Sequence, residues 1–262
     1  MSWRTHVVAG VCLVGLAGLV GLASPAAAVV AVSFGASWDG SSSLQAIIDA
    51  RYGAGNINVS TDYIGAKPTD HDPWFWVDSH FSTYLIREVA GNADRNTIGW
   101  YVDTGASSPG AQPVLLNDNI HDGVVFDGAA TDGQTVAITF PLPRTKFGFY
   151  LNPNGPLSVE NAPEPEKFFT NRFFNDLGPD GTGALHAPTN GDVQALVFDV
   201  SKFDGPNTWL VAFEDLDSGA NPSACCSGTD NDFNDVVFEV TAFGATPVIP
   251  MTFGALKSKY LH

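Results

Sequence analysis

The sequence predicts an all-β protein, an antiparallel β-sandwich or jelly roll with one short N-terminal helix. Three observations support this class. Short runs of aromatic and β-branched residues recur along the chain, and Asp-Gly or Asn-Gly turns separate many of them. Strands and turns in such alternation are typical of sandwiches. One stretch has apolar residues at the spacing of an amphipathic helix.

The predicted helix covers residues 41–51, with the sequence SSSLQAIIDAR. One of its serines can accept a hydrogen bond from a free backbone N–H group of the first turn. Leu44, Ile47 and Ile48 then lie on one helical face. The two glycines that follow, at positions 53 and 55, end the pattern.

The predicted strands share aromatic and β-branched content and are bounded by turn residues. They are residues 74–77, 83–89, 97–102, 123–126, 135–140, 146–151, 193–200, 208–213 and 235–243. No period of fixed length relates them. We interpret the Pro-rich stretch 152–166 as a long loop within one domain, because strand patterns continue on both sides of it.

The first 28 residues are typical of a secretory signal peptide. A short basic start precedes an apolar run at residues 7–22 and a small-residue end at Ala28. The run is shorter than the 20 or so residues that span a bilayer. We expect cleavage after Ala28, a β-sandwich domain at 29–245 and a C-terminal tail at 246–262. The expected location is secreted, extracellular or at the cell surface, with no membrane span after cleavage.

The charge of the chain argues against one class of partner. The sequence has 12 Lys and Arg residues against 28 Asp and Glu, a net charge of −16. Such a surface repels the phosphate backbone, so we expect no nucleic-acid partner.

After cleavage two cysteines remain, Cys225 and Cys226, and they are adjacent. A bond between neighbours is strained, because their Cα atoms are closer than an ordinary disulfide prefers. A vicinal disulfide, a bond to another chain and two free thiols all stay open.

Acidic residues are concentrated near the C-terminal end of the predicted domain. Between Lys202 and Lys257 the sequence has no Lys or Arg, but it has eight acids. They are Asp204, Glu214, Asp215, Asp217, Asp230, Asp232, Asp235 and Glu239. If strands 208–213 and 235–243 are antiparallel neighbours, two acidic clusters meet at the base of one loop. Converging carboxylates take up protons or bind a cation, and oxygen ligands in this number favour calcium.

In the second acidic cluster, just before strand 235–243, polar side chains stand at every other position. In an extended chain Asp230, Asp232 and Asn234 point the same way. An EF-hand does not fit, because Asp235 stands at its sixth position, where Gly is needed, and Thr241 at its twelfth, where Glu is needed. The alternative to a metal site is a solvated acidic loop or a set of Asx turns.

Two strands carry apolar side chains on alternate positions. Val236, Phe238 and Val240 share one face of their strand, and Trp74 and Trp76 share one face of theirs. We expect both sets to lie in the core. Exposed Trp rings would instead favour a sugar-binding platform.

Residues 213–240 carry a recognisable signature. The segments Phe213-Glu214-Asp215-Leu216 and DNDFNDVVFEV at 230–240 resemble the domain-of-unknown-function 4114 family, which occurs in secreted and cell-surface proteins of bacteria. Residues 147–151 and 168–176 resemble the run into this signature. Segments within 44–49 and 88–101 resemble the N-terminal half of exported proteins with this domain.

This resemblance implies a secreted β-sandwich-like module with a calcium site and no established enzymatic activity. The metal ligands that it implies are Glu214, Asp215, Asp230, Asp232 and Asp235, with Asn231 and Asn234 as helpers. The insert around the two cysteines lengthens the usual loop.

The leading functional hypothesis is a non-catalytic calcium-binding module that acts as a surface, matrix or adhesion component. Its candidate partners are extracellular polysaccharide and other surface proteins. A carbohydrate-binding module that uses the Trp-rich strand is the first alternative. A glycoside-active enzyme with Glu214, Asp215 and Glu239 as carboxylates is less favoured, because carboxylates crowded in one loop do not flank a substrate cleft. No nucleophile, phosphate-loop or zinc motif is present in the sequence, and we expect no enzymatic activity.

Overall fold

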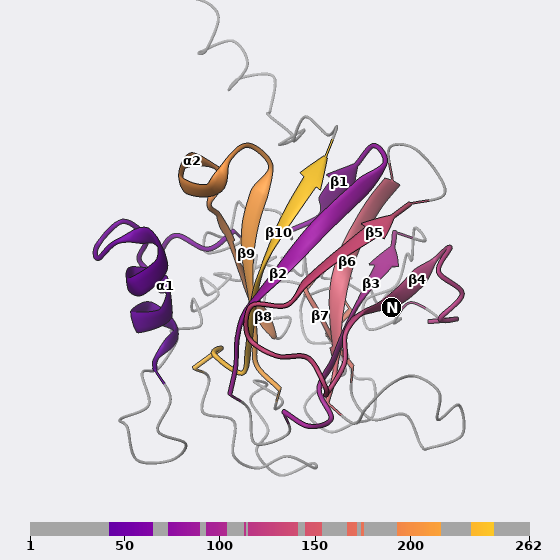
Figure 1. The fold of residues 1–262 in the computed structure, drawn as a ribbon, viewed down its shortest axis with the longest axis horizontal. Helices are drawn as coiled ribbons and strands as arrows, with labels where there is room; N and C mark the ends of the chain where they lie inside the picture. The colour runs from indigo at the N-terminus through magenta and orange to yellow at the C-terminus, as the bar shows by residue number, and fades with distance from the viewer. Residues whose placement is uncertain are drawn as a thin grey trace, which may run out of the picture.

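The computed structural model describes residues 42–64, 73–89, 93–103, 113, 115–140, 145–153, 167–171, 174–175, 193–215 and 232–243. Within these residues the chain forms two five-stranded sheets that pack face to face, with a helix against the outer face of one sheet (Figure 1). The strand pairings are antiparallel throughout. The predicted antiparallel β-sandwich with a short N-terminal helix is confirmed.

The first sheet has the strand order β1-β6-β3-β4, with β7 beside β6. Its strands are β1 (Phe75–Val77), β6 (Thr145–Asn152), β3 (Thr97–Val102), β4 (Asp122–Phe126) and β7 (Phe168–Phe169). The second sheet has the order β5-β2-β10-β9-β8. Its strands are β5 (Thr135–Thr139), β2 (His80–Glu88), β10 (Val236–Phe243), β9 (Thr208–Phe213) and β8 (Ala195–Asp199).

The bounds of β3 and β9 are those predicted, and the other predicted strands differ by at most three residues at an end. The two-residue strand β7 and the four-residue helix α2 (Ser201–Asp204) were not predicted. Both are too short to show a period in the sequence.

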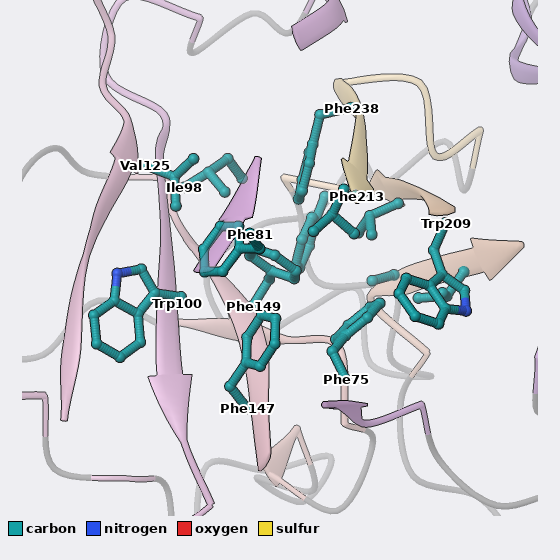
Figure 2. Close-up of a cluster of buried hydrophobic side chains, with 14 of the residues drawn as sticks. Phe75, Phe81, Ile98, Trp100, Val125, Phe147, Phe149, Trp209, Phe213 and Phe238 are labelled. Atoms are coloured by element: carbon teal, nitrogen blue, oxygen red, sulfur yellow. The ribbon is translucent and has the colours of Figure 1, made fainter. Parts of the chain in front are cut away.

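Phenylalanines fill the space between the sheets (Figure 2). Phe75, Phe147 and Phe149 come from the first sheet, and Phe81 and Phe238 come from the second; all five are buried. Phe81 stacks on Phe147 with ring centroids 5.0 Å apart, and Phe149 meets Phe238 edge to face at 5.1 Å. These rings bring the inner faces of the two sheets into contact.

Strand β10 is buried on both of its faces. Val236, Phe238 and Val240 lie in the core between the sheets, as predicted. Val237 points to the other side, into a second cluster with residues of α1 (Leu44–Tyr52). The near-continuous burial of this strand fits its central place in its sheet.

The predicted core position of the two tryptophans is wrong for Trp76. Phe75 and Val77 occupy the inner face of β1, so the alternating residues lie on its outer face. Trp76 is 37% exposed. Trp74 is half-buried, and the Nζ atom of Lys146 lies 4.3 Å from its ring centroid. The positions of the large aromatic residues in the sequence were therefore not enough to predict the inner face of β1.

Helix α1 covers β8, β9 and β10 on the outer face of the second sheet. The side chain of Ser43 caps the start of the helix by accepting a hydrogen bond from the N–H of Ala46 at 3.3 Å. Gly53, with a φ of 93°, follows its last residue. The capping serine and the terminating glycine confirm the two sequence signals.

Two glycine–tyrosine pairs lie side by side across β3 and β6. Gly99 is opposite Tyr150, and Tyr101 is opposite Gly148. A Cβ atom on Gly99 would lie 2.2 Å from the Tyr150 ring, and one on Gly148 would lie 2.6 Å from the Tyr101 hydroxyl oxygen. Each ring therefore covers the backbone of the glycine that it faces, an arrangement that only glycine permits.

We expect Gly99→Ala to lower the free energy of unfolding by about 2 kcal/mol, because the added methyl group displaces the buried ring of Tyr150. Urea unfolding of the variant measures this loss. In the double variant Gly99→Ala/Tyr150→Ala the overlap is absent, so the combined loss should be smaller than the sum of the two single losses. Additive losses would show that the ring does not constrain position 99.

Candidate metal centre

Several strands of the second sheet end or begin at one place, the lower end of the sheet in Figure 1. Strand β9 pairs antiparallel with β10, and Phe213 lies opposite Val236. Glu214 directly follows β9, and Asp235 directly precedes β10. The two acidic segments of the sequence therefore meet at the base of one connection, as predicted.

Three carboxylates converge at this end. Glu214, Asp232 and Asp235 offer oxygen atoms that all lie within 4.8 Å of one another. The exposed fractions of these residues are 1%, 3% and 9%. Burial removes the water that would screen them, so three ionised carboxylates at this separation repel one another strongly.

Asp215 is the fourth buried acid of the group. Its backbone N–H donates a hydrogen bond to Oδ2 of Asp235 at 2.7 Å. Its own Oδ2 accepts a hydrogen bond from Nδ2 of Asn96 at 3.1 Å. Asp215 thus connects the carboxylate cluster to Asn96, the residue directly before β3 of the other sheet.

The segment before β10 is not extended, which corrects the expectation for Asp232 and Asn234. Phe233 has a φ of 54°, in the left-handed region that a bulky residue rarely adopts. Its ring is buried in the cluster with α1, and its N–H donates to Oε2 of Glu214 at 3.4 Å. The turn at Phe233 brings both Asp232 and Asp235 to Glu214.

Asn234 holds the carboxylate of Asp232 in place. Its backbone N–H donates to Oδ1 of Asp232 at 3.2 Å, and its Nδ2 donates to Oδ2 at 2.7 Å. The same Nδ2 also donates to the carbonyl oxygen of Ser42 at 3.2 Å, at the start of α1. Asn234 therefore orients the carboxylate of Asp232 and links it to the start of the N-terminal helix.

Burial raises the pKa of Asp235 well above its ordinary value, and the negative charges of Glu214 and Asp215 raise it further. The hydrogen bond from the N–H of Asp215 lowers it by less. Negative groups thus dominate the surroundings of this carboxyl. A cation bound among the four acids would remove that repulsion.

Glu88, at the end of β2, extends the acidic surroundings. Burial raises its pKa to about 7, and the charges of Asp132, Asp215 and Asp127 contribute to the rise. Its cross-strand partner is Val236, at the start of β10. The region around the candidate centre thus has a second carboxyl that holds its proton more tightly in the folded chain.

We expect Glu88→Gln to raise stability at pH 8 and to leave it unchanged at pH 4, with a chelator present. The folded-state pKa of Glu88 lies above the ordinary value of 4.5, so the folded chain binds more protons than the unfolded chain between pH 4.5 and about 7. The free energy of unfolding of the wild type therefore decreases as pH rises through this window. The glutamine variant lacks this contribution because its side chain does not titrate. Urea unfolding at pH 4, 6 and 8 measures it. Asp94→Asn, which removes an exposed charge, is the control; an equal gain at every pH would contradict the prediction.

A different acidic loop, residues 115–122, shows what a structural turn looks like. Both carboxylate oxygens of Asp122 accept backbone N–H groups, from Leu116 and Asn117, each at 2.8 Å. Asp118 likewise accepts the N–H groups of Ile120 and His121, each at 2.8 Å. Backbone donors satisfy these two carboxylates. In the candidate centre backbone N–H groups also reach Glu214, Asp232 and Asp235, but there the carboxylate oxygens of three acids lie within 4.8 Å of one another.

Glu239, a candidate catalytic carboxylate, lies apart from the cluster. It is opposite Leu210 within the sheet and contacts the side chains of Arg51, Tyr52 and Asp204. The Nε atom of Arg51 donates to Oε1 of Glu239 at 2.7 Å. The structure therefore does not join Glu239 to Glu214 and Asp215.

Other expectations fall outside the described residues. Asp230 and Asn231, two of the implied ligand and helper positions, are among them. So are Cys225 and Cys226, the expected signal peptide and the tail 246–262. In the part of the chain that the structure covers, no helix has the length and apolar character that crossing a membrane requires.

Asn96 was not among the predicted site residues. This residue is 2% exposed and precedes β3 in the first sheet. A polar residue next to a predicted strand is a weak signal, because the sequence does not show which strand ends of two sheets lie together. Knowledge of the sheet packing is needed to bring Asn96 to Asp215.

Comparison with known families gave one finding. Residues 143–242 match the family model described as a domain of unknown function (DUF4114). This range runs from β6 to the next-to-last residue of β10 and includes the carboxylates of the candidate centre, but it leaves out Asn96 and α1. Neither the curated proteins nor the solved structures gave a match.

Proposed function

From the match of residues 143–242 to the family model described as a domain of unknown function (DUF4114), we propose that the protein is a secreted, non-catalytic, calcium-binding β-sandwich. In this proposal it acts as a surface, matrix or adhesion component. The observation that carries it is the buried cluster of Glu214, Asp232 and Asp235 at one end of the second sheet.

The donor set fits a hard cation. The cluster offers carboxylate oxygens, and the sequence from 203 to 256 contains neither Lys nor Arg to neutralise them. Calcium takes six to eight oxygen ligands in flexible geometry, whereas zinc favours Cys and His. Four buried acids, two just after β9 and two just before β10, therefore suit calcium better than a transition metal.

The residues that would hold the ion are Glu214, Asp232 and Asp235, with Asp215 beside them. The ion would supply positive charge that offsets the mutual repulsion of these carboxylates. The turn at Phe233 and the hydrogen bonds from Asn234 orient the two aspartates before any ion arrives. Asp230 and Asn231 remain proposed contributors from the adjoining sequence.

Thermal unfolding in calcium and in chelator tests the proposal. A ligand that binds only the folded state, present at 100 times its dissociation constant, adds about 2.7 kcal/mol to the free energy of unfolding. For a chain of this size we expect a rise in melting temperature of about 5–10 °C. Magnesium should raise it less, because it requires a smaller, octahedral site. Identical melting curves in calcium and chelator would reject calcium binding.

The proposed export needs its own experiment. The protein is produced in its native host, and the N-terminus of the material outside the cells is determined by mass spectrometry. We expect it at Val29, after cleavage at Ala28. Recovery of the uncleaved chain from the cell fraction alone would contradict this part of the proposal.

A carbohydrate-binding module is the second candidate function, and Trp76 favours it. This residue is 37% exposed on the outer face of β1, and exposed Trp rings stack on sugars. Binding to extracellular polysaccharide should then be lost in Trp76→Ala and kept in Asp235→Asn. Equal retention of polysaccharide by wild type and Trp76→Ala would argue against this candidate.

The glycoside-active enzyme is the least favoured candidate. Its three nominated carboxylates are Glu214, Asp215 and Glu239, and Glu239 contacts Arg51 and Tyr52 rather than the other two. A retaining or inverting glycosidase needs two carboxyl groups on opposite sides of one glycosidic bond. Assay of the purified protein on a panel of glycans, with Glu214→Gln as a control, tests this activity directly.

A further inference from the structure

Asn96 reaches the candidate centre from the opposite sheet. It directly precedes β3, in the first sheet, whereas the carboxylates follow β9 or precede β10, in the second sheet. Its Nδ2 atom donates to Oδ2 of Asp215 at 3.1 Å, and both residues are buried. This hydrogen bond therefore links the two sheets at the end where the acids gather.

The amide oxygen of Asn96, Oδ1, is buried and accepts no hydrogen bond in the described part of the structure. Buried polar atoms in folded proteins are almost always satisfied, and an exception calls for an ion or a water molecule. An amide oxygen is a ligand that calcium uses commonly, and it adds no negative charge to a site that already has four acids.

The backbone around Asn96 is held closely. A Cβ atom at Gly128 would lie 2.1 Å from the carbonyl oxygen of Asp94, so the turn before β3 packs directly on the glycine. The side-chain hydroxyl of Thr97 donates to the carbonyl oxygen of Arg95 at 3.5 Å. These contacts fix the position from which the amide of Asn96 approaches Asp215.

We propose that Oδ1 of Asn96 is a ligand of the cation held by Glu214, Asp232 and Asp235, so that one ion joins the two sheets of the sandwich. This inference rests on the proposed calcium site and adds a residue that lies outside the family match at 143–242. The ion then does more than neutralise the second sheet: it attaches the beginning of β3 to the ends of β9 and β10.

Calorimetric titration of calcium into the full protein and its variants tests the inference. We expect Asn96→Ala to weaken calcium binding at least tenfold, with unchanged stoichiometry, and Asn96→Asp to retain most of the affinity. The matched control is Asn175→Ala. Asn175 is another buried asparagine, which hydrogen-bonds the backbone of Phe169. This control should lower stability without changing the affinity for calcium.

Terbium luminescence separates a direct ligand from a residue that only positions others. Terbium replaces calcium at oxygen sites, and its decay rates in H2O and D2O count the water molecules bound to the ion. We expect Asn96→Ala to gain about one bound water relative to wild type, since water fills the position of the lost amide oxygen. This water count comes from the folded protein that has bound terbium, so it can be measured even if the alanine variant is partly unfolded.

The outcomes separate this inference from the proposed function. Wild-type protein that binds neither calcium nor terbium overturns both. Wild-type binding, with an unchanged dissociation constant and an unchanged water count in Asn96→Ala, overturns only the role of Asn96. Weaker binding with an unchanged water count likewise rejects direct ligation.

Discussion

In a calcium-free buffer Asp235→Asn is expected to raise the melting temperature, whereas in saturating calcium the same substitution is expected to lower it. Without the ion, Asp235 is a buried carboxyl surrounded by the acids Glu214, Asp215 and Asp232, and its pKa is raised. Asparagine removes the charge and keeps an oxygen that can accept the N–H of Asp215. With calcium bound at the proposed site, the same change would remove a charged ligand.

The size of the reversal follows from linkage. If calcium binds at the proposed site, a concentration of 100 times its dissociation constant adds about 2.7 kcal/mol to wild-type stability, and we expect the variant to lose most of this gain. Thermal unfolding of both proteins, in chelator and in calcium, measures all four values. A substitution that lowers stability equally in both buffers would show an ordinary structural role for Asp235.

The pH dependence of stability gives a second test of the same variant. The folded-state pKa of Asp235 is raised above 3.8, so the folded wild type binds more protons than the unfolded chain above that pH. Without the ion, wild-type stability therefore falls as pH rises from 3.8 through the raised pKa. The advantage of the asparagine variant in chelator should appear in this window and vanish in stronger acid.

Asp199→Asn is the matched control for both readings. Asp199 also accepts a backbone N–H, from Ser201 at 3.0 Å. It lies opposite Trp209, at the other end of the β8–β9 pair from the carboxylate cluster. Neutralising it should leave the calcium response unchanged.

Arg51→Met is expected to lower the free energy of unfolding by about 3 kcal/mol at pH 7. Burial raises the pKa of Glu239, but hydrogen bonds from Arg51, Asp204 and Tyr52 outweigh it, so this pKa is lowered overall. Arg51 donates to both carboxylate oxygens, and 29% of its side chain is exposed. Its removal leaves a buried carboxylate on the central strand β10 without its cation.

The loss should depend on pH in a defined direction. In wild type the lowered pKa of Glu239 contributes stability that is present above 4.5 and is lost as pH falls through the folded-state value. In the methionine variant Glu239 can take a proton, so the difference from wild type should shrink toward pH 4. Urea unfolding at pH 7 and pH 4 measures both losses.

Two further variants serve as controls for Arg51→Met. Arg87→Met breaks an ion pair with Asp132 in which both side chains are exposed, and we expect a loss below about 1 kcal/mol. The double variant Arg51→Met/Glu239→Met should recover part of the single loss, because no buried charge remains. Equal losses in Arg51→Met and Arg87→Met would contradict the buried role of the first pair.

Much of the fold follows from local patterns. The alternation in residues 236–240 identified the inner face of β10, and Ser43 and Gly53 mark the ends of α1. Such signals depend on neighbours in the sequence, so they survive without knowledge of the packing. The antiparallel meeting of 208–213 with 235–243 was a conditional prediction, and the observed register confirms it.

The failures have non-local causes. The burial tendency of aromatic residues predicts a core position for Trp76, but Phe75 and Val77 occupy the inner face of β1. The left-handed turn at Phe233 has no signal in the sequence, since a buried contact with α1 fixes a conformation that phenylalanine disfavours on its own. Asn96 reaches Asp215 only after two sheets have packed.

The central place of β10 has a mechanical consequence. This strand is hydrogen-bonded to β2 on one side and to β9 on the other, along almost its whole length. A pull along its axis must shear both ladders at once rather than open them one rung at a time. Midway along β10, the ion pair of Glu239 with Arg51 attaches the strand to α1 and adds resistance to sliding. We therefore expect β10 to resist a force along its axis more strongly than the edge strand β8, which is paired on one side.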